Sequence, residues 1–157
     1  MNRGIRLTLV AVTGFVALTA FLGGAVLIMG SLSPGLGSVL VPPADYLRGS
    51  PFSGYAVPGL VLMLLVGGPQ AVASIGCGVR WPWAPAACAA AGFSCLIWIF
   101  VQMIYIPFSP LQAVYFAFGM LELGLLLLGM GVLHPAGVLR HGSVRRASTR
   151  HPVMRAR

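Results

Sequence analysis

The chain has 157 residues, of which 58% are hydrophobic and only 8% are charged. Soluble domains carry about a quarter charged residues, so this composition, with a mean hydropathy of +0.93, excludes a water-soluble globular protein. The net charge of +8 comes from ten arginines set against two acids, Asp45 and Glu122. Because these charges lie beside long apolar runs, anionic lipid headgroups are the expected partner and nucleic acid is not.

Four apolar runs follow one another along the chain, and each is long enough to cross about 30 Å of hydrocarbon. They cover about 7–29, 57–79, 83–106 and 111–133. The first run lacks a small-residue cleavage site and is longer than a signal-peptide core, so we expect a retained helix. The sequence therefore predicts an all-α membrane protein, with residues 1–134 forming four transmembrane helices in an antiparallel bundle.

The arginines predict which way the bundle faces. Four spans place both termini on one side, and this side receives Arg3, Arg6, Arg80 and the six arginines after residue 135, whereas the other side has only Arg48. Since positively charged loops stay in the cytoplasm, we expect a plasma-membrane protein with both termini cytoplasmic. We expect the basic tail, 135–157, to be disordered and to lie against anionic headgroups.

The first two runs are joined by an outer loop, 31–56, which is rich in Gly, Pro and Ser but too apolar for a free linker. We expect it to lie along the membrane interface. One helical turn is predicted near Pro43, where Asp45 and Arg48 are spaced to form an i, i+3 ion pair.

Small residues recur at spacings of three and four, which predicts close helix contacts in lipid. The predicted contact faces are Thr13, Ala17, Ala20 and Gly24; Gly67, Ala71, Ser74 and Gly78; and Cys88, Ala91 and Cys95. Whether these faces meet within one chain or between copies is left open, with packing within one chain expected. Pro69 lies inside the second run and is expected to kink its helix, because proline lacks the N–H of a helical hydrogen bond.

Glu122 lies near the middle of the fourth run, where a carboxylate costs roughly 2.5–3.5 kcal/mol. Since no Lys, Arg or His lies inside any run, either the carboxyl group is protonated or it faces polar partners or water.

Polar residues on the same helical faces predict an intramembrane cluster around this acid. Gln112, Tyr115, Gly119 and Glu122 share one face of the fourth run, and Cys95, Trp98, Gln102 and Tyr105 share one face of the third. Folding the last two runs about residues 108–109 places Trp98 level with Gly119 and Cys95 level with Glu122. The predicted cluster consists of Glu122, Gln70, Ser94, Gln102, Gln112 and Tyr115, with Thr19 nearby.

This cluster has two interpretations. It is either a proton-titrating or ligand-binding pocket that opens outward, or a set of interhelical hydrogen bonds that fix helix rotation with Glu122 neutral. No catalytic set, cofactor motif or metal-ligand spacing is found among the three cysteines and three histidines, so we expect no catalytic, cofactor or metal residues.

The stretch Ser50-Pro51-Phe52-Ser53-Gly54-Tyr55-Ala56-Val57-Pro58-Gly59-Leu60, together with Gly119-Met120-Leu121-Glu122-Leu123, resembles small four-span actinobacterial membrane proteins of unassigned function. The resemblance covers about residues 5–133 and implies the same four-span fold. It implies no activity.

We therefore expect a non-enzymatic accessory or structural subunit, partnered by a larger membrane protein or by a second copy. The alternative is a small oligomeric proton-linked transporter or ligand-binding protein that uses Glu122.

Overall fold

The computed structural model describes residues 1–33, 35, 41–48 and 52–132. In chain order the elements are α1 (Arg3–Leu32), the 3₁₀ turn η1 (Ala44–Leu47), α3 (Ala56–Val61), the π-helical segment η2 (Leu62–Gly67), α4 (Gly68–Gly78), α5 (Ala84–Tyr105) and α6 (Pro110–Gly129). The described residues contain no strand. The predicted tail, 135–157, and parts of the outer loop lie outside the described residues.

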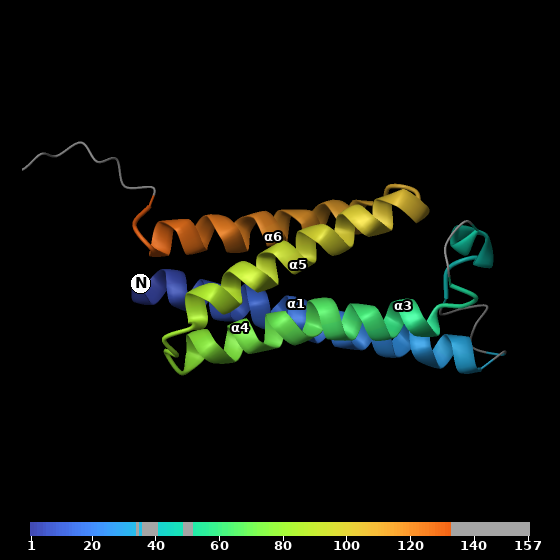
Figure 1. Cartoon of the computed structure of the whole chain (residues 1–157), viewed down its shortest axis with the longest axis horizontal. Coiled ribbons are helices and arrows are strands. Elements are labelled where there is room, and N and C mark those ends of the chain that lie inside the picture. The colour runs from blue at the N-terminus through green and yellow to red at the C-terminus, as the bar shows by residue number, and fades with distance from the viewer. Residues whose placement is uncertain (34, 36–40, 49–51, 133–157) are drawn as a thin grey trace, which may run out of the picture.

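Four of the described helical stretches are long and apolar enough to cross a membrane: α1, the continuous stretch Ala56–Gly78, α5 and α6. This confirms the four predicted runs and the all-helical class. Helix α1 packs against the second stretch and against α6, while α4 packs against α5 and α5 against α6. Chain neighbours therefore pack together, and the α1–α6 contact closes the bundle (Figure 1).

The two ends of the bundle carry different features (Figure 1). One end, called the N-terminal end below, carries the start of α1, the turn at 79–83 and the end of α6. The other, the loop end, carries η1 and the turn at 106–109. This arrangement determines which side chains lie at the same depth in the bundle.

The helix ends depart from the predicted runs because local capping stops the helices. Helix α6 ends at Gly129 rather than near residue 133, since Gly131 adopts a φ of 75°. The Val132 N–H donates to the Leu127 carbonyl at 3.1 Å and the Gly131 N–H to the Leu128 carbonyl at 3.1 Å. This pair of bonds is the Schellman motif, which requires a left-handed residue, most easily glycine.

Pro69 does not lie in the middle of an α-helix. The segment η2 immediately precedes α4, and the Gly68 N–H donates to the Met63 carbonyl five residues earlier. The wider π-turn leaves Pro69 in the first turn of α4, where an N–H is not needed. The structure shows a π-helical segment immediately before this proline, and the predicted kink itself stays a prediction.

The predicted small-residue faces are buried on α1 and α5, whereas the predicted face Gly67, Ala71, Ser74 and Gly78 contacts α1 at Gly67 and Ser74 but is fully buried only at Gly67. Thr13, Ala17, Ala20 and Gly24 are all buried, as are Cys88, Ala91 and Cys95. On α4 the buried residues are instead Gln70, Ala73, Gly76 and Cys77. Gly78 is exposed because α4 ends there, and Ser74 turns toward α1, where its Oγ donates to the Val10 carbonyl at 3.0 Å.

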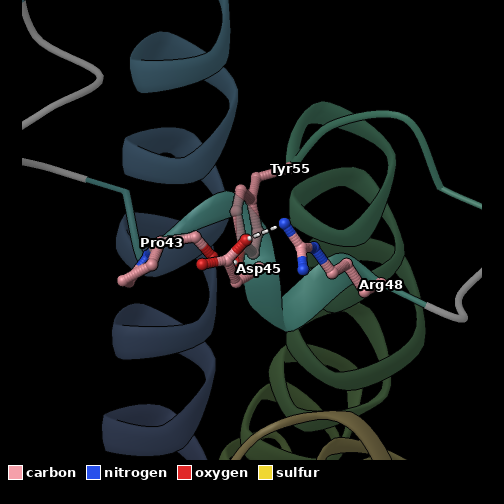
Figure 2. Close-up of polar contacts among 4 residues, drawn as sticks. All are labelled: Pro43, Asp45, Arg48 and Tyr55. Atoms are coloured by element: carbon pink, nitrogen blue, oxygen red, sulfur yellow. Dashed lines mark hydrogen bonds and ion pairs between the residues drawn. The ribbon is translucent and has the colours of Figure 1, made fainter.

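The outer loop forms the helical turn and the ion pair that the sequence predicted. Arg48 Nη2 lies 3.0 Å from Asp45 Oδ1, and both side chains are largely exposed, so the pair contributes little stability (Figure 2). The Tyr55 hydroxyl donates to the Pro43 carbonyl at 2.9 Å. Burial, and then the neighbouring Tyr46, raises the pKa of Tyr55, so this phenol remains a donor that holds the loop to the start of α3.

Candidate functional site

A hydrogen bond between two enclosed side chains joins α4 to α6 at the centre of the bundle. Gln70 Nε2 donates to Glu122 Oε2 at 2.8 Å. Both residues are 0% exposed. The only acid in the four runs is therefore bonded to an amide on another helix and is shielded from lipid and solvent.

Helix α5 completes this polar centre through one backbone carbonyl. Gln70 Nε2 also donates to the Ala91 carbonyl at 3.3 Å, and Ser94 Oγ donates to the same carbonyl at 2.9 Å. Three helices thus meet at the Gln70 amide, which satisfies both of its N–H groups. We call Gln70, Glu122, Ser94 and the Ala91 carbonyl the polar centre.

One oxygen of each of the two enclosed side chains accepts no hydrogen bond from the described residues. These atoms are Gln70 Oε1 and Glu122 Oε1. A carboxylate has no donor to offer an amide oxygen, whereas a carboxylic acid or a primary amide has one. The polar centre can therefore accept a neutral, hydrogen-bonding group at residue 122.

The other predicted cluster residues lie toward the loop end, away from the polar centre. Gln112 forms a capping box: its Oε1 accepts from the Ser109 N–H at 3.0 Å, and its own N–H donates to Ser109 Oγ at 3.4 Å. Thr19 Oγ1 donates to carbonyls of its own helix, Phe15 at 2.9 Å and Val16 at 3.1 Å. The six predicted residues therefore form two groups rather than one cluster.

The second group lines a cavity of about 280 Å³ near the loop end, called the loop-end pocket. Its walls come from α1, η2, α5, the turn at 106–109 and α6. The lining residues are Thr19, Ala20, Gly23, Leu62, Val66, Cys95, Trp98, Ile99, Gln102, Ile106, Ser109, Leu111, Gln112 and Tyr115. Within the described residues, the Gln102 amide and the Tyr115 hydroxyl have no hydrogen-bond partner. Glu122 does not line this pocket.

The predicted levels of α5 and α6 are wrong, because Gly119 lies opposite Gly92, which is more than one helical turn from the predicted Trp98. A Cβ built on Gly119 would lie 2.9 Å from Leu96 Cδ2 and 3.3 Å from the Gly92 carbonyl oxygen, so its close neighbours are Leu96 and Gly92 rather than Trp98. Cys95 Sγ reaches the Tyr115 carbonyl at 3.5 Å. Helix α5 runs obliquely to α6 (Figure 1), so equal counts from the turn do not reach equal levels.

Sequence reasoning also missed a contact between two thiols. Cys77 Sγ and Cys88 Sγ lie 3.2 Å apart, and both side chains are buried. They lie on either side of the short turn between α4 and α5. Their positions close to this turn could have predicted the contact, because a tight turn brings the adjoining helix ends together. The prediction grouped Cys88 with Cys95 instead, because those two residues share a helical face.

Comparisons of the chain with protein families, with curated proteins and with solved structures found no match. The resemblance to small four-span actinobacterial proteins therefore stays a prediction.

Proposed function

We propose that the chain is a multi-pass plasma-membrane protein with both termini in the cytoplasm. Arg3, Arg6 and Arg80 lie at the N-terminal end of the bundle, and the arginine-rich tail follows α6, which ends there. Only Arg48 belongs to the loop end. This asymmetry supports a cytoplasmic N-terminal end through the positive-inside rule.

Cysteine labelling tests this orientation. The native cysteines are all buried, so an introduced cysteine is the labelled site. In intact cells a membrane-impermeant maleimide is expected to label Ser53→Cys, whereas Asn2→Cys is expected to react only after the membrane is opened. Labelling of Asn2→Cys in intact cells, with Ser53→Cys protected, would reverse the orientation.

The role that the geometry supports best is that of a non-enzymatic accessory or structural subunit. The observation that carries this proposal is the enclosed Gln70–Glu122 hydrogen bond. The acid that could have served as a catalytic or proton-carrying group is used in helix packing, where no substrate reaches it. Such a protein acts through its folded surface, which fits a subunit of a larger membrane assembly.

Isolation in a mild detergent tests this role. We expect a larger membrane protein to co-purify in fixed stoichiometry, and Glu122→Gln to retain it, because an amide can still bond to Gln70. A wild-type chain that is always recovered without a partner would contradict the proposal. Loss of the partner from a folded Glu122→Gln variant would contradict it too, since the carboxyl group itself would then be required.

The loop-end pocket favours a second candidate, the binding of a small apolar molecule that carries one or two polar groups. Its walls are mostly apolar, and Gln102 and Tyr115 offer unused hydrogen-bonding groups. In the same isolation, mass spectrometry is expected to detect a small lipophilic molecule that Gly23→Leu displaces. A Cβ on Gly23 meets only Leu62 Cδ2, at 3.6 Å, so this variant is expected to fill the pocket without moving α1. Equal retention by Gly23→Leu would exclude this candidate.

A further inference from the structure

Three arginines from distant parts of the sequence line one cavity at the N-terminal end. Arg3 and Arg6 come from the first two turns of α1, and Arg80 comes from the turn between α4 and α5. The cavity has a volume of about 480 Å³. Its remaining wall includes Trp81 and Ala84. We call it the arginine cavity.

No carboxylate side chain of the chain can neutralise these three charges. The chain has two acidic residues. Asp45 is paired with Arg48 in the outer loop, and Glu122 is enclosed with Gln70 inside the bundle. Within the described residues, none of the three guanidinium groups has a hydrogen-bond or ion-pair partner. Like charges gathered in one cavity repel, so the arrangement favours an anion supplied from outside.

The backbone at Arg80 gives an independent indication. Arg80 has a φ of 60°, and the Trp81 N–H donates to the Gly76 carbonyl at 2.8 Å. The same type of helix end at α6 uses Gly131, the residue that adopts this conformation most easily. A large side chain in a left-handed conformation is disfavoured and is found preferentially at functional sites.

We propose that the arginine cavity binds the phosphate headgroup of an anionic phospholipid. Guanidinium groups bind phosphate oxygens in a bidentate manner. The cavity lies at the ends of three apolar helical stretches, beside the exposed rings of Trp81 and Trp83, a position typical of the headgroup level. A lipid phosphate therefore fits better than a phosphate free in solution. This site is separate from the subunit role, and it requires no partner protein.

Fluorescence quenching in vesicles tests the proposal with Trp81 as the reporter. The full chain, with Trp83→Phe and Trp98→Phe, is placed in phosphatidylcholine vesicles that contain brominated phosphatidylglycerol or brominated phosphatidylcholine. We expect brominated phosphatidylglycerol to bind preferentially. Arg80→Gly is expected to reduce that preference about fivefold, because each arginine near the surface adds to the attraction for anionic lipid. Because glycine suits the left-handed turn, this variant keeps the fold. Its matched control is Arg48→Gln, which removes one arginine at the loop end and leaves the preference unchanged.

Two further arms distinguish other sources of the binding. Replacing the six arginines of the tail by glutamine is expected to leave the quenching preference at Trp81 intact. If that variant abolishes the preference while Arg80→Gly and Arg6→Gln do not, the proposal is wrong and the tail holds the lipid. Inorganic phosphate at millimolar concentration is expected not to displace brominated phosphatidylglycerol. Displacement by phosphate would assign the cavity to a soluble anion instead. None of these outcomes depends on whether a partner protein co-purifies.

Discussion

Gly59→Ala is expected to lower the stability of the bundle by about 1–3 kcal/mol, the usual cost of overpacking a close contact. A Cβ at residue 59 would lie 2.7 Å from the Gly24 carbonyl oxygen and 3.0 Å from Leu27 Cβ. The Gly24 oxygen belongs to the backbone and Leu27 Cβ is bonded directly to it. Neither atom can rotate away, so α1 and α3 would have to separate. Thermal unfolding in detergent measures the loss.

Gly124→Ala is the matched control for that prediction. A Cβ on Gly124 would meet nothing within 4 Å, so the same chemical change in α6 is free of steric cost. Alanine favours a helix by up to about 1 kcal/mol over glycine, and we expect unchanged or higher stability. Equal destabilisation by Gly59→Ala and Gly124→Ala would mean that the α1–α3 contact is looser than described.

Glu122→Leu is expected to destabilise the bundle by about 1–3 kcal/mol, because it leaves the Gln70 amide enclosed without its acceptor at 2.8 Å. Leucine is apolar and suits a membrane helix, so a loss of stability would come from the broken bond and not from poor insertion. Glu122→Gln is the isosteric control, and it is expected to stay within about 0.5 kcal/mol of the wild type, the range of a neutral substitution. Chemical or thermal unfolding in detergent compares the two.

Hydropathy was sufficient to predict the four helical stretches, because a single run long and apolar enough to cross lipid must satisfy its own backbone hydrogen bonds there, and a helix does so. The ends of the helices depend on single residues. The end of α6 follows from the left-handed Gly131, and the π-turn before Pro69 follows from the need to place a residue without an N–H. Such local backbone conformations produce no signal in a hydropathy profile.

The candidate site was predicted only in part, because helix periodicity assigns a face and not a partner. Glu122 and Gln70 were placed in one predicted cluster, and the structure brings them into contact. Gln112 shares the face of Glu122, but its side chain caps α6 at Ser109. The contact of Gly92 with Gly119 depends on the oblique course of α5, which spacing within a single helix does not encode.

The arginine cavity could not be predicted from the sequence either. Arg3, Arg6 and Arg80 were counted on one side of the membrane because they share a sign and an expected side. Their gathering in one cavity depends on how α1 packs against the end of α4, which only the folded chain determines. Charge counting therefore predicted an orientation but not a binding site.

The central claim is that Glu122 serves the fold by bonding to Gln70 within one chain. The most direct measurement is a double-mutant cycle of unfolding free energies for Gln70→Leu, Glu122→Leu and the double variant. Each single variant leaves one polar group enclosed, whereas the double variant removes both, so we expect it to recover at least half of the summed loss. If the two losses simply add, the residues do not stabilise each other and the claim is contradicted.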